Sequence, residues 1–514
     1  MVQNEKRILA CIVFMAVLCT AFPSFAEIIS NITNSVSCGA HLAWEYDTEI
    51  KILTISGSGK MSEFDSSSTG MLAPWKKDKD AKNLEKVLIS EGVTTIGDNA
   101  FFECDNLISV TIPNSVISIG EAAFCQCTDL KSVTIPDGMT DSGDAALQRS
   151  NLTSIEKDAF LNCTGLTSIT IFNMTADGDS AFSERSSLVN IGEGAFNNCN
   201  GLTSVAIPDG VKSIGDHAFQ FCGALTNITL PDSLTCIGDG AFQATACYNE
   251  WSANSAQCNV LYIGHHLIKA DEWELNKSMS DNVISSNYVV EPGTKSIADC
   301  ALYYCQELTG ITLPDSMAGI GNRAFEHCSK LTSVTIPSRV TSIGSEAFST
   351  CSALTSITIT DGVTIIDQKT FYDCSGLTSI TIPNSVLIIG ENAFEGCRTS
   401  MKVYYTGSEA DWGEVIGDGK SVLKDTNIYY CKGITATRND DGTIEVSPNK
   451  IDSGTVILAL YGGDKGDKLI EMQSEKYSGT KITFTPTQTY TRAKIMIWNS
   501  LGGMSPECGI KNVR

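Results

Sequence analysis

Histidine is scarce in this 514-residue chain, which contains five. A metal site or a catalytic dyad that uses imidazole therefore has few residues to draw on. Basic side chains are also in the minority, because 36 Lys and Arg stand against 59 Asp and Glu, for a formal net charge of −23. So acidic a chain repels nucleic acid and anionic lipid, and we expect neither as a partner.

Long apolar runs are absent after residue 26. Before it, Lys6 and Arg7 precede an apolar run over residues 8–22, and small residues follow at 23–26. This order predicts a cleaved signal peptide over residues 1–26, and hence a secreted or cell-surface protein. Leu18 disfavours lipidation at Cys19, since a lipoprotein signal has a small residue there. The run is short for a bilayer, so we expect no membrane span.

One pattern dominates the rest of the chain. The block that contains Ile96-Gly97 restarts 23 residues later, and its isoleucine recurs in near-fixed register. The recurring positions are Ile96, Ile119, Ile155, Ile191, Ile214, Ile237, Ile297, Ile320, Ile343, Ile366 and Ile389. Two gaps of 36 residues each contain a shortened copy, at 139–147 and 174–182, and one gap of 60 carries an insertion. Such a period indicates a solenoid of stacked repeats.

Each repeat is interpreted as one rung. Val110 and Ile112 form an inward-facing strand that ends at Pro113. The chain returns through Ile119, and Ala123–Phe124 are expected in a buried short helical turn. No single copy can bury this apolar set alone, so the copies must stack into one continuous core.

The repeat form Ile-Gly-x-x-Ala-Phe-x-x-Cys-x-x-Leu-x-Ser-Val-Thr-Ile-Pro resembles the BspA-like leucine-rich repeats of bacterial surface proteins, over residues 91–400. The flanks at 38–75 and 403–412 resemble segments that accompany these repeats. The resemblance implies an α/β leucine-rich-repeat solenoid, β-rich with 23-residue rungs, that serves adhesion or recognition. It implies no catalytic residues, since the family has no shared active site, and we expect no enzyme.

The predicted organisation has five parts. They are a signal peptide (1–26), an N-terminal capping β region (27–90), the solenoid (91–400, with an insertion at about 244–286), a C-terminal cap (401–433) and a β-sandwich-like domain (434–514). Five short strands separated by turn residues indicate an immunoglobulin- or fibronectin-like sandwich for the last part. They are expected at residues 444–446, 456–460, 469–472, 482–484 and 493–498. Within the insertion, residues 260–269 predict a hairpin that turns at Gly264-His265.

Half of the 20 cysteines follow the repeat. These are Cys104, Cys127, Cys163, Cys199, Cys222, Cys305, Cys328, Cys351, Cys374 and Cys397, three residues after the Phe position or its Leu302 substitute. Equivalent positions face one interior column, where Cys packs as a small hydrophobe, so we expect a ladder of free buried thiols. Pairwise bridging along the column is the alternative. Cys247 and Cys258, in the insertion, are better disulfide candidates.

Other polar features have structural interpretations. An acidic row follows the Gly position in seven copies, and we expect each carboxylate to accept backbone N–H groups at the start of a short helical turn. The row is Asp98, Glu121, Glu193, Asp216, Asp239, Asp299 and Glu391. Residues 439–442 resemble part of a calcium loop but lack its spaced ligands, and predict a hairpin turn. No metal or cofactor site is indicated.

Recognition is expected at the central irregularity of the concave face, because identical Ser/Thr rungs offer little discrimination. The candidate contacts are Trp251, Tyr262, His265, His266, Trp273, Val289, Thr229 and Thr312. Their aromatic members fill the core of the hairpin in the alternative interpretation. The expected partner is an extracellular protein or a glycan. A structural envelope protein without a specific ligand is the alternative function, and the oligomeric state is not indicated.

Overall fold

The structure, a computed structural model, describes most of the chain. The described residues are 37–66, 70–78, 81–134, 150–170, 187–253, 260–270, 287–425, 427–430, 435–438, 443–447, 454–462, 468–477, 482–487, 492–498 and 506–513. The expected signal peptide, the two shortened copies and the turn at 439–442 lie outside them. The chain divides into two compact units, one of residues 1–188 and 195–202 and the other of residues 189–194 and 203–514.

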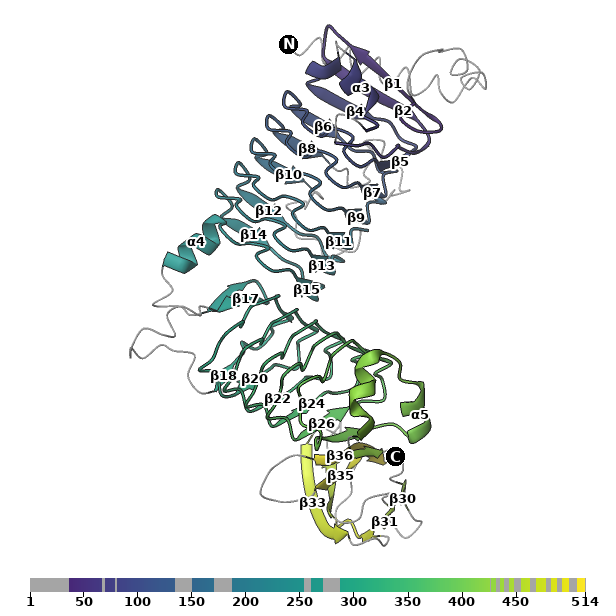
Figure 1. The fold of residues 1–514 in the computed structure, drawn as a ribbon, viewed down its shortest axis with the longest axis vertical. Helices are drawn as coiled ribbons and strands as arrows, with labels where there is room; N and C mark the ends of the chain where they lie inside the picture. Colours follow the sequence, from purple (N-terminus) through teal and green to yellow (C-terminus); the bar gives the residue numbers. More distant parts are fainter. Residues whose placement is uncertain are drawn as a thin grey trace. The chain divides into compact units, whose positions relative to one another are not determined.

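The first unit stacks short strands in two columns (Figure 1). The first column is β1 (Leu42–Asp47), β2 (Ile52–Gly57), β4 (Lys86–Ile89), β6 (Ser109–Thr111), β8 (Ser132–Thr134) and β10 (Ser168–Thr170); the second is β3 (Gly59–Lys60), β5 (Val93–Ile96), β7 (Ser118–Ile119) and β9 (Ser154–Ile155). Successive rungs pair in parallel at equivalent positions, for example Val110 with Val133. The 23-residue period therefore sets the register directly.

The start of the first unit continues the core of the rungs. The antiparallel hairpin β1–β2 precedes α3 (Pro74–Lys77) and the 3-10 turn η1 (Ala81–Asn83). Trp75 is fully buried, stacks on Phe101 at 5.1 Å between ring centroids, and donates its indole N–H to the carbonyl of Ala100 over 2.8 Å. A tryptophan thus covers the first phenylalanine of the repeat.

The repeated phenylalanines form stacks of rings inside each unit. In the first unit, Phe124 lies 5.0 Å from Phe101 and 5.1 Å from Phe160, with interplanar angles of 11° and 3°. In the second unit, Phe348 stacks in the same way on Phe325 and Phe371. All of these rings are fully buried. Burial of a phenylalanine side chain stabilises a fold by about 1.5–3 kcal/mol, so this column is a major part of the core.

The segment around each phenylalanine is not helical, and the predicted short helical turn is wrong. Ala122 and Gln126 have φ of 51° and 62°, values in the left-handed region that interrupt a helix. Phe101 N–H donates to the carbonyl of Ala123 in the next rung over 2.7 Å, whereas Cys104 N–H donates within its own turn. Alternation of the two patterns makes this segment a third column of contacts between rungs.

The acidic row also acts between rungs, which corrects the expected capping role. Asp98 Oδ1 accepts the N–H of Glu121 over 2.8 Å, 23 residues later. Asp216 accepts from Asp239 over 2.8 Å, and Asp299 accepts from Asn322 over 2.7 Å, at the same spacing. No helix starts at these positions, so each aspartate fastens its own rung to the next one.

The second unit repeats the two columns on either side of an insertion. Its strands before the insertion are β11 (Asn190–Ile191), β13 (Ser213–Ile214) and β15 (Cys236–Ile237) in one column and β12 (Ser204–Ala206) and β14 (Asn227–Thr229) in the other. After the insertion, the first column continues with β19 (Ser296–Ile297), β21 (Gly319–Ile320), β23 (Ser342–Ile343), β25 (Ile365–Ile366) and β27 (Ile388–Ile389). The other column continues with β18 (Tyr288–Val289), β20 (Ile311–Thr312), β22 (Ser333–Thr335), β24 (Ser356–Thr358), β26 (Ser379–Ile382), β28 (Lys402–Tyr405) and β29 (Asn427–Tyr430). Between β28 and β29 lie α5 (Glu409–Glu414) and the 3-10 helix η4 (Asp418–Asp425).

An all-β tail follows the last rung. Its described strands form a three-stranded antiparallel sheet and a four-stranded antiparallel sheet. The first contains β30 (Thr435–Arg438), β31 (Ile444–Ser447) and β34 (Ile482–Phe484), and the second β33 (Lys468–Tyr477), β32 (Gly454–Gly462), β35 (Arg492–Trp498) and β36 (Pro506–Val513). All five strands expected here are confirmed, and β30 and β36 were not predicted. An immunoglobulin- or fibronectin-like arrangement stays a prediction.

Candidate functional site

The regular rungs of the second unit are broken once, after β15. We call residues 244–290 the interruption; its described parts are 244–253, 260–270 and 287–290. They form α4 (Ala246–Ala253), the hairpin of β16 (Val260–Ile263) and β17 (His266–Ala270), and β18. The hairpin and its turn at Gly264-His265 confirm the prediction. Trp273 and Cys258, two other predicted residues, lie outside the described parts.

Strand β17 replaces a rung strand. It pairs in parallel with β19, His266 opposite Ser296 and Leu267 opposite Ile297, in the register in which β7 pairs Ser118 with Ser154 and Ile119 with Ile155 of β9. Ala270 N–H donates to the carbonyl of Ala301 over 2.7 Å, the bond that a phenylalanine makes elsewhere. The hairpin is therefore part of the solenoid wall.

His266 is fully buried, and its prediction as a contact residue is wrong. Its Nδ1 lies 2.8 Å from Ser296 Oγ and its Nε2 lies 3.1 Å from the carbonyl oxygen of Pro231. Because a carbonyl only accepts, Nε2 carries the proton and Nδ1 accepts from the serine. Burial lowers the pKa of His266, so the imidazole stays neutral and joins two rungs.

His265, the preceding residue, points into solvent. Its Nδ1 lies 2.7 Å from Asp232 Oδ1, and Lys295 Nζ lies 3.1 Å from Asp232 Oδ2. The hydrogen bond from His265 lowers the pKa of the Asp232 carboxyl. All three side chains are at least one quarter exposed, so these contacts add little stability but offer both charges to a partner.

The other predicted contacts differ in exposure. Val289 is 59% exposed and lies opposite Thr312 across β18 and β20. Thr312 is exposed, as is Thr229 on β14, which pairs with Ala206. Val289 thus places an isopropyl group where plain rungs carry a hydroxyl.

Two of the three predicted aromatic contacts, Tyr262 and Trp251, make contacts with other residues of the interruption or its border. The Tyr262 hydroxyl lies 3.0 Å from that of Tyr288 and accepts the N–H of Glu291 over 3.3 Å. Trp251 packs edge-on against Tyr248, with centroids 5.3 Å apart. Both residues are half-buried, so each combines a local packing role with an accessible edge.

A cluster of rings that the sequence analysis missed lies beside the interruption. Tyr303 and Tyr304 follow Leu302 on the turn to which β17 bonds, and His327 occupies the position of Tyr304 one rung later. The ring centroids of Tyr304 and His327 are 4.9 Å apart, and Arg323 lies 5.1 Å from the centroid of Tyr303. We call Tyr303, Tyr304, Arg323 and His327 the aromatic cluster. The signal was two aromatics where other rungs carry Asn197-Asn198 or Cys125-Gln126.

The ten ladder cysteines lie where they were expected. None of the ten forms a disulfide; nine are buried, and Cys397 is partly exposed. Seven of the thiols donate to a carbonyl one rung earlier, as Cys163 does to Phe124 over 3.1 Å and Cys328 to Leu302 over 3.3 Å. Burial is the largest cause that raises the pKa of Cys104, and the same holds for Cys374. High pKa values keep such thiols protonated and poor as nucleophiles or metal ligands.

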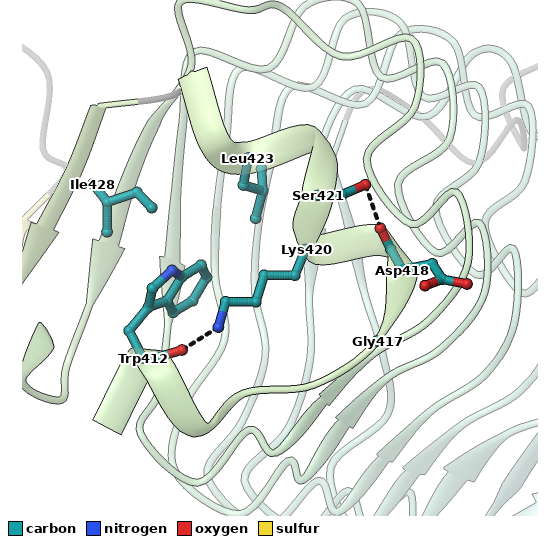
Figure 2. A pocket seen from close by; sticks show the side chains of 7 residues that line it. All are labelled: Trp412, Gly417, Asp418, Lys420, Ser421, Leu423 and Ile428. Carbon is teal, nitrogen blue, oxygen red and sulfur yellow. Dashed lines mark hydrogen bonds between the residues drawn. The ribbon is translucent and has the colours of Figure 1, made fainter. Parts of the chain in front are cut away.

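A cavity of about 310 Å³ lies near the last rungs (Figure 2). It is lined by Trp412, Gly417, Asp418, Lys420, Ser421, Leu423 and Ile428. Lys420 Nζ donates to the carbonyls of Trp412 and Val415 and lies 5.3 Å from the Trp412 ring centroid. Its ammonium group therefore caps the C-terminal end of α5. The basic side chain of the cavity lining thus has a structural role.

Neither a cluster of metal ligands nor a membrane-spanning helix is present among the described residues. No group of three or more His, Cys, Asp or Glu within the described ranges is arranged to hold a metal ion. The helices that the structure describes are all too short and too polar to cross a bilayer.

Comparison with known proteins supports the repeat interpretation. The BspA type Leucine rich repeat region matches residues 79–189, 148–269 and 274–408 in six copies. No curated protein matches the chain. Among solved structures, a leucine rich cell surface protein of Faecalibacterium prausnitzii is 26% identical, with a TM-score of 0.30 over 75% of this chain and 98% of the other. A leucine-rich repeat protein of Bacteroides ovatus is 19% identical, with a TM-score of 0.28 over 77% and 99%. The pneumococcal vaccine antigen PcpA is 17% identical, with a TM-score of 0.27 over 77% and 98%.

The family match covers more than half of the chain and coincides with the rungs seen in the structure. Repeats of this kind and the solenoid that they build are typical of proteins that bind rather than catalyse. The chain belongs to the BspA-type leucine-rich-repeat family.

Proposed function

We propose that the protein is a secreted or cell-surface recognition protein, which binds an extracellular protein or a glycan through its solenoid. The BspA-type repeat supports surface recognition or adhesion as the general role. The observation that carries the finer proposal is the exposure of distinct groups at the interruption. Val289 is 59% exposed on β18, and His265 of the hairpin forms an exposed charged network with Asp232 and Lys295.

The interruption suits recognition better than the plain rungs do. Along the plain rungs, hydroxyls at the strand start are already used within the wall, since Thr355 Oγ1 donates to the carbonyl of Thr332 over 3.0 Å and Thr378 Oγ1 to that of Thr355 over 2.9 Å. Specificity needs groups that differ from those of the plain rungs, and the interruption carries both an exposed apolar side chain and a charged network. We therefore assign the contact surface to Trp251, Tyr262, His265 and Val289.

The experiment is a binding screen of the full chain against matrix proteins and glycans, repeated with a triple variant. Trp251→Ser, His265→Asn and Val289→Thr remove the exposed groups without touching β17, whose deletion would open the wall. We expect at least a tenfold loss of affinity in the triple variant. The matched control is Leu387→Thr, since Leu387 is also 59% exposed but lies on a regular rung. Equal binding by the triple variant and the wild type would refute the proposed surface.

We also propose that residues 434–514 form a separate immunoglobulin- or fibronectin-like sandwich that presents the solenoid. The two antiparallel sheets of the described tail support this proposal. The segment expressed alone should melt cooperatively by circular dichroism. A disordered amide spectrum would assign the tail to the solenoid cap instead.

A further inference from the structure

The aromatic cluster combines one exposed ring with two half-buried ones. Tyr304 is 44% exposed, so burial of its ring contributes little to the free energy of unfolding. Its ring contacts that of Tyr303 at 5.5 Å and that of His327 at 4.9 Å between centroids, and Tyr303 lies 5.8 Å from His327. Three rings from two successive rungs thus form one continuous apolar patch on the outer turn.

The backbone at this position is left-handed in other described rungs as well. Tyr304 and His327 have φ of 65° and 62°, in the left-handed region. Asn162 and Asn198 occupy the equivalent position in other rungs with φ of 61° and 59°, and asparagine tolerates that region well. Phe221 also holds this position with a φ of 59°, so the conformation belongs to the rung and does not single out Tyr304.

Charges around the cluster cancel one another. Arg323 Nε pairs with Glu326 and, over 3.3 Å, with Glu346, which also pairs with Lys369 Nζ over 3.5 Å. On the neighbouring turn, Lys330 pairs with Glu307 over 2.7 Å. Three basic groups therefore face three acidic ones, and the patch lacks the net charge that attracts polyanions or basic peptides.

We infer that the aromatic cluster is a platform for a neutral saccharide. One face of a pyranose carries C–H groups that stack on Tyr303 and Tyr304, as apolar groups do on aromatic faces. The hydroxyls at the rim of such a ring match the planar donors of Arg323, whose side chain is 44% exposed. This inference rests on the proposed function and gives its partner a chemical class at a site next to the interruption.

The test uses the full chain and an immobilised panel of a mannan, a β-glucan, a galactan and chitohexaose, with heparin as the anionic probe. The variant Tyr303→Asn/Tyr304→Asn copies the Asn197-Asn198 of another rung, so it should fold at least as well as the wild type by thermal melting. Tyr303→Phe/Tyr304→Phe keeps the rings. Tyr372→Ala is the matched control, because Tyr372 occupies the position of Tyr303 on a later rung and is half-buried.

We expect the wild type to bind at least one neutral saccharide with an affinity that stays constant over a roughly tenfold range of salt. The affinity for that saccharide should fall about tenfold or more in the Asn variant and less than about threefold in the Phe variant. It should not change measurably in Tyr372→Ala. Saccharide binding that survives in the Asn variant, or binding to heparin alone, would overturn the platform. Binding to matrix proteins with no saccharide bound would also overturn it and leave the proposed function standing. A chain that binds no probe of either class would contradict both.

Discussion

The thiol of Cys351 donates a hydrogen bond to the carbonyl oxygen of Phe325, 26 residues earlier, over 3.1 Å. The same bond joins Cys374 to Phe348 and Cys397 to Phe371 in the following rungs. Cysteine fits this position because it is small, apolar and still a weak donor. The ladder therefore adds a side-chain bond to the contacts between successive rungs.

Ladder thiols should resist modification in the native protein. Burial raises the pKa of Cys351 well above its usual value, and the protonated thiol is a poor nucleophile. A thiol reagent should label few of them until denaturant is added, after which the count should rise by about ten. Intact-mass data that show five disulfides among the ladder cysteines would contradict this account.

Stability should fall at alkaline pH. Burial raises the pKa of the Cys397 thiol from 9.0 to about 12, so the folded chain holds protons that the unfolded chain releases above pH 9. The unfolding free energy should therefore decrease as pH rises from 9 towards 12, and stay constant below that window with respect to this group. Urea titrations at several pH values measure the slope, which should be shallower in Cys397→Val. An equal slope in both proteins would rule out the thiol as the cause.

The ring stack should dominate the core. Phe348→Ala removes a fully buried ring between two others and should cost about 3–5 kcal/mol in urea unfolding. Phe221→Asn is the matched control, because Phe221 is 51% exposed and has a φ of 59° that asparagine tolerates. It should change stability by less than about 0.5 kcal/mol. Similar losses of unfolding free energy in both variants would show that the buried ring stack is not the main source of core stability.

Asp299 should make the second unit more stable in mild acid. Burial raises the pKa of its carboxyl to about 6 from 3.8, so the folded chain binds the proton more tightly than the unfolded chain does. The unfolding free energy should therefore decrease as pH rises through this window, by about 1–3 kcal/mol. Asp299→Asn should abolish this pH dependence of the unfolding free energy, while its amide oxygen can still accept the N–H of Asn322. An unchanged pH profile in the variant would locate the effect elsewhere.

Much of the fold could be predicted because each rung position recurs. Val110 and Val133 pair as the period requires, and the tail strand expected at 493–498 appears as β35. The turn around Phe124 could not be predicted, since Ala122 and Gln126 adopt left-handed conformations that their side chains do not favour. Contacts with the next rung impose that conformation.

The candidate site was predicted only in part. The hairpin and the outward Val289 follow from local pattern, whereas the burial of His266 depends on Pro231 and Ser296 from two other segments. Tyr303 and Tyr304 were overlooked because they follow the buried Leu302 in a repeat whose pattern describes the core well. Whether a ring on a turn is exposed depends on how neighbouring rungs stack, and a short stretch of sequence does not show that stacking.

Hydrogen exchange of the full chain, with and without the partner found in the screen, tests the central claim most directly. Backbone amides that a partner covers or stabilises exchange more slowly. The account predicts slower exchange at residues 260–270 and 287–304, and unchanged rates at residues 109–134 of the plain rungs. Protection confined to the plain rungs or to residues 434–514, with none at the interruption, would contradict it.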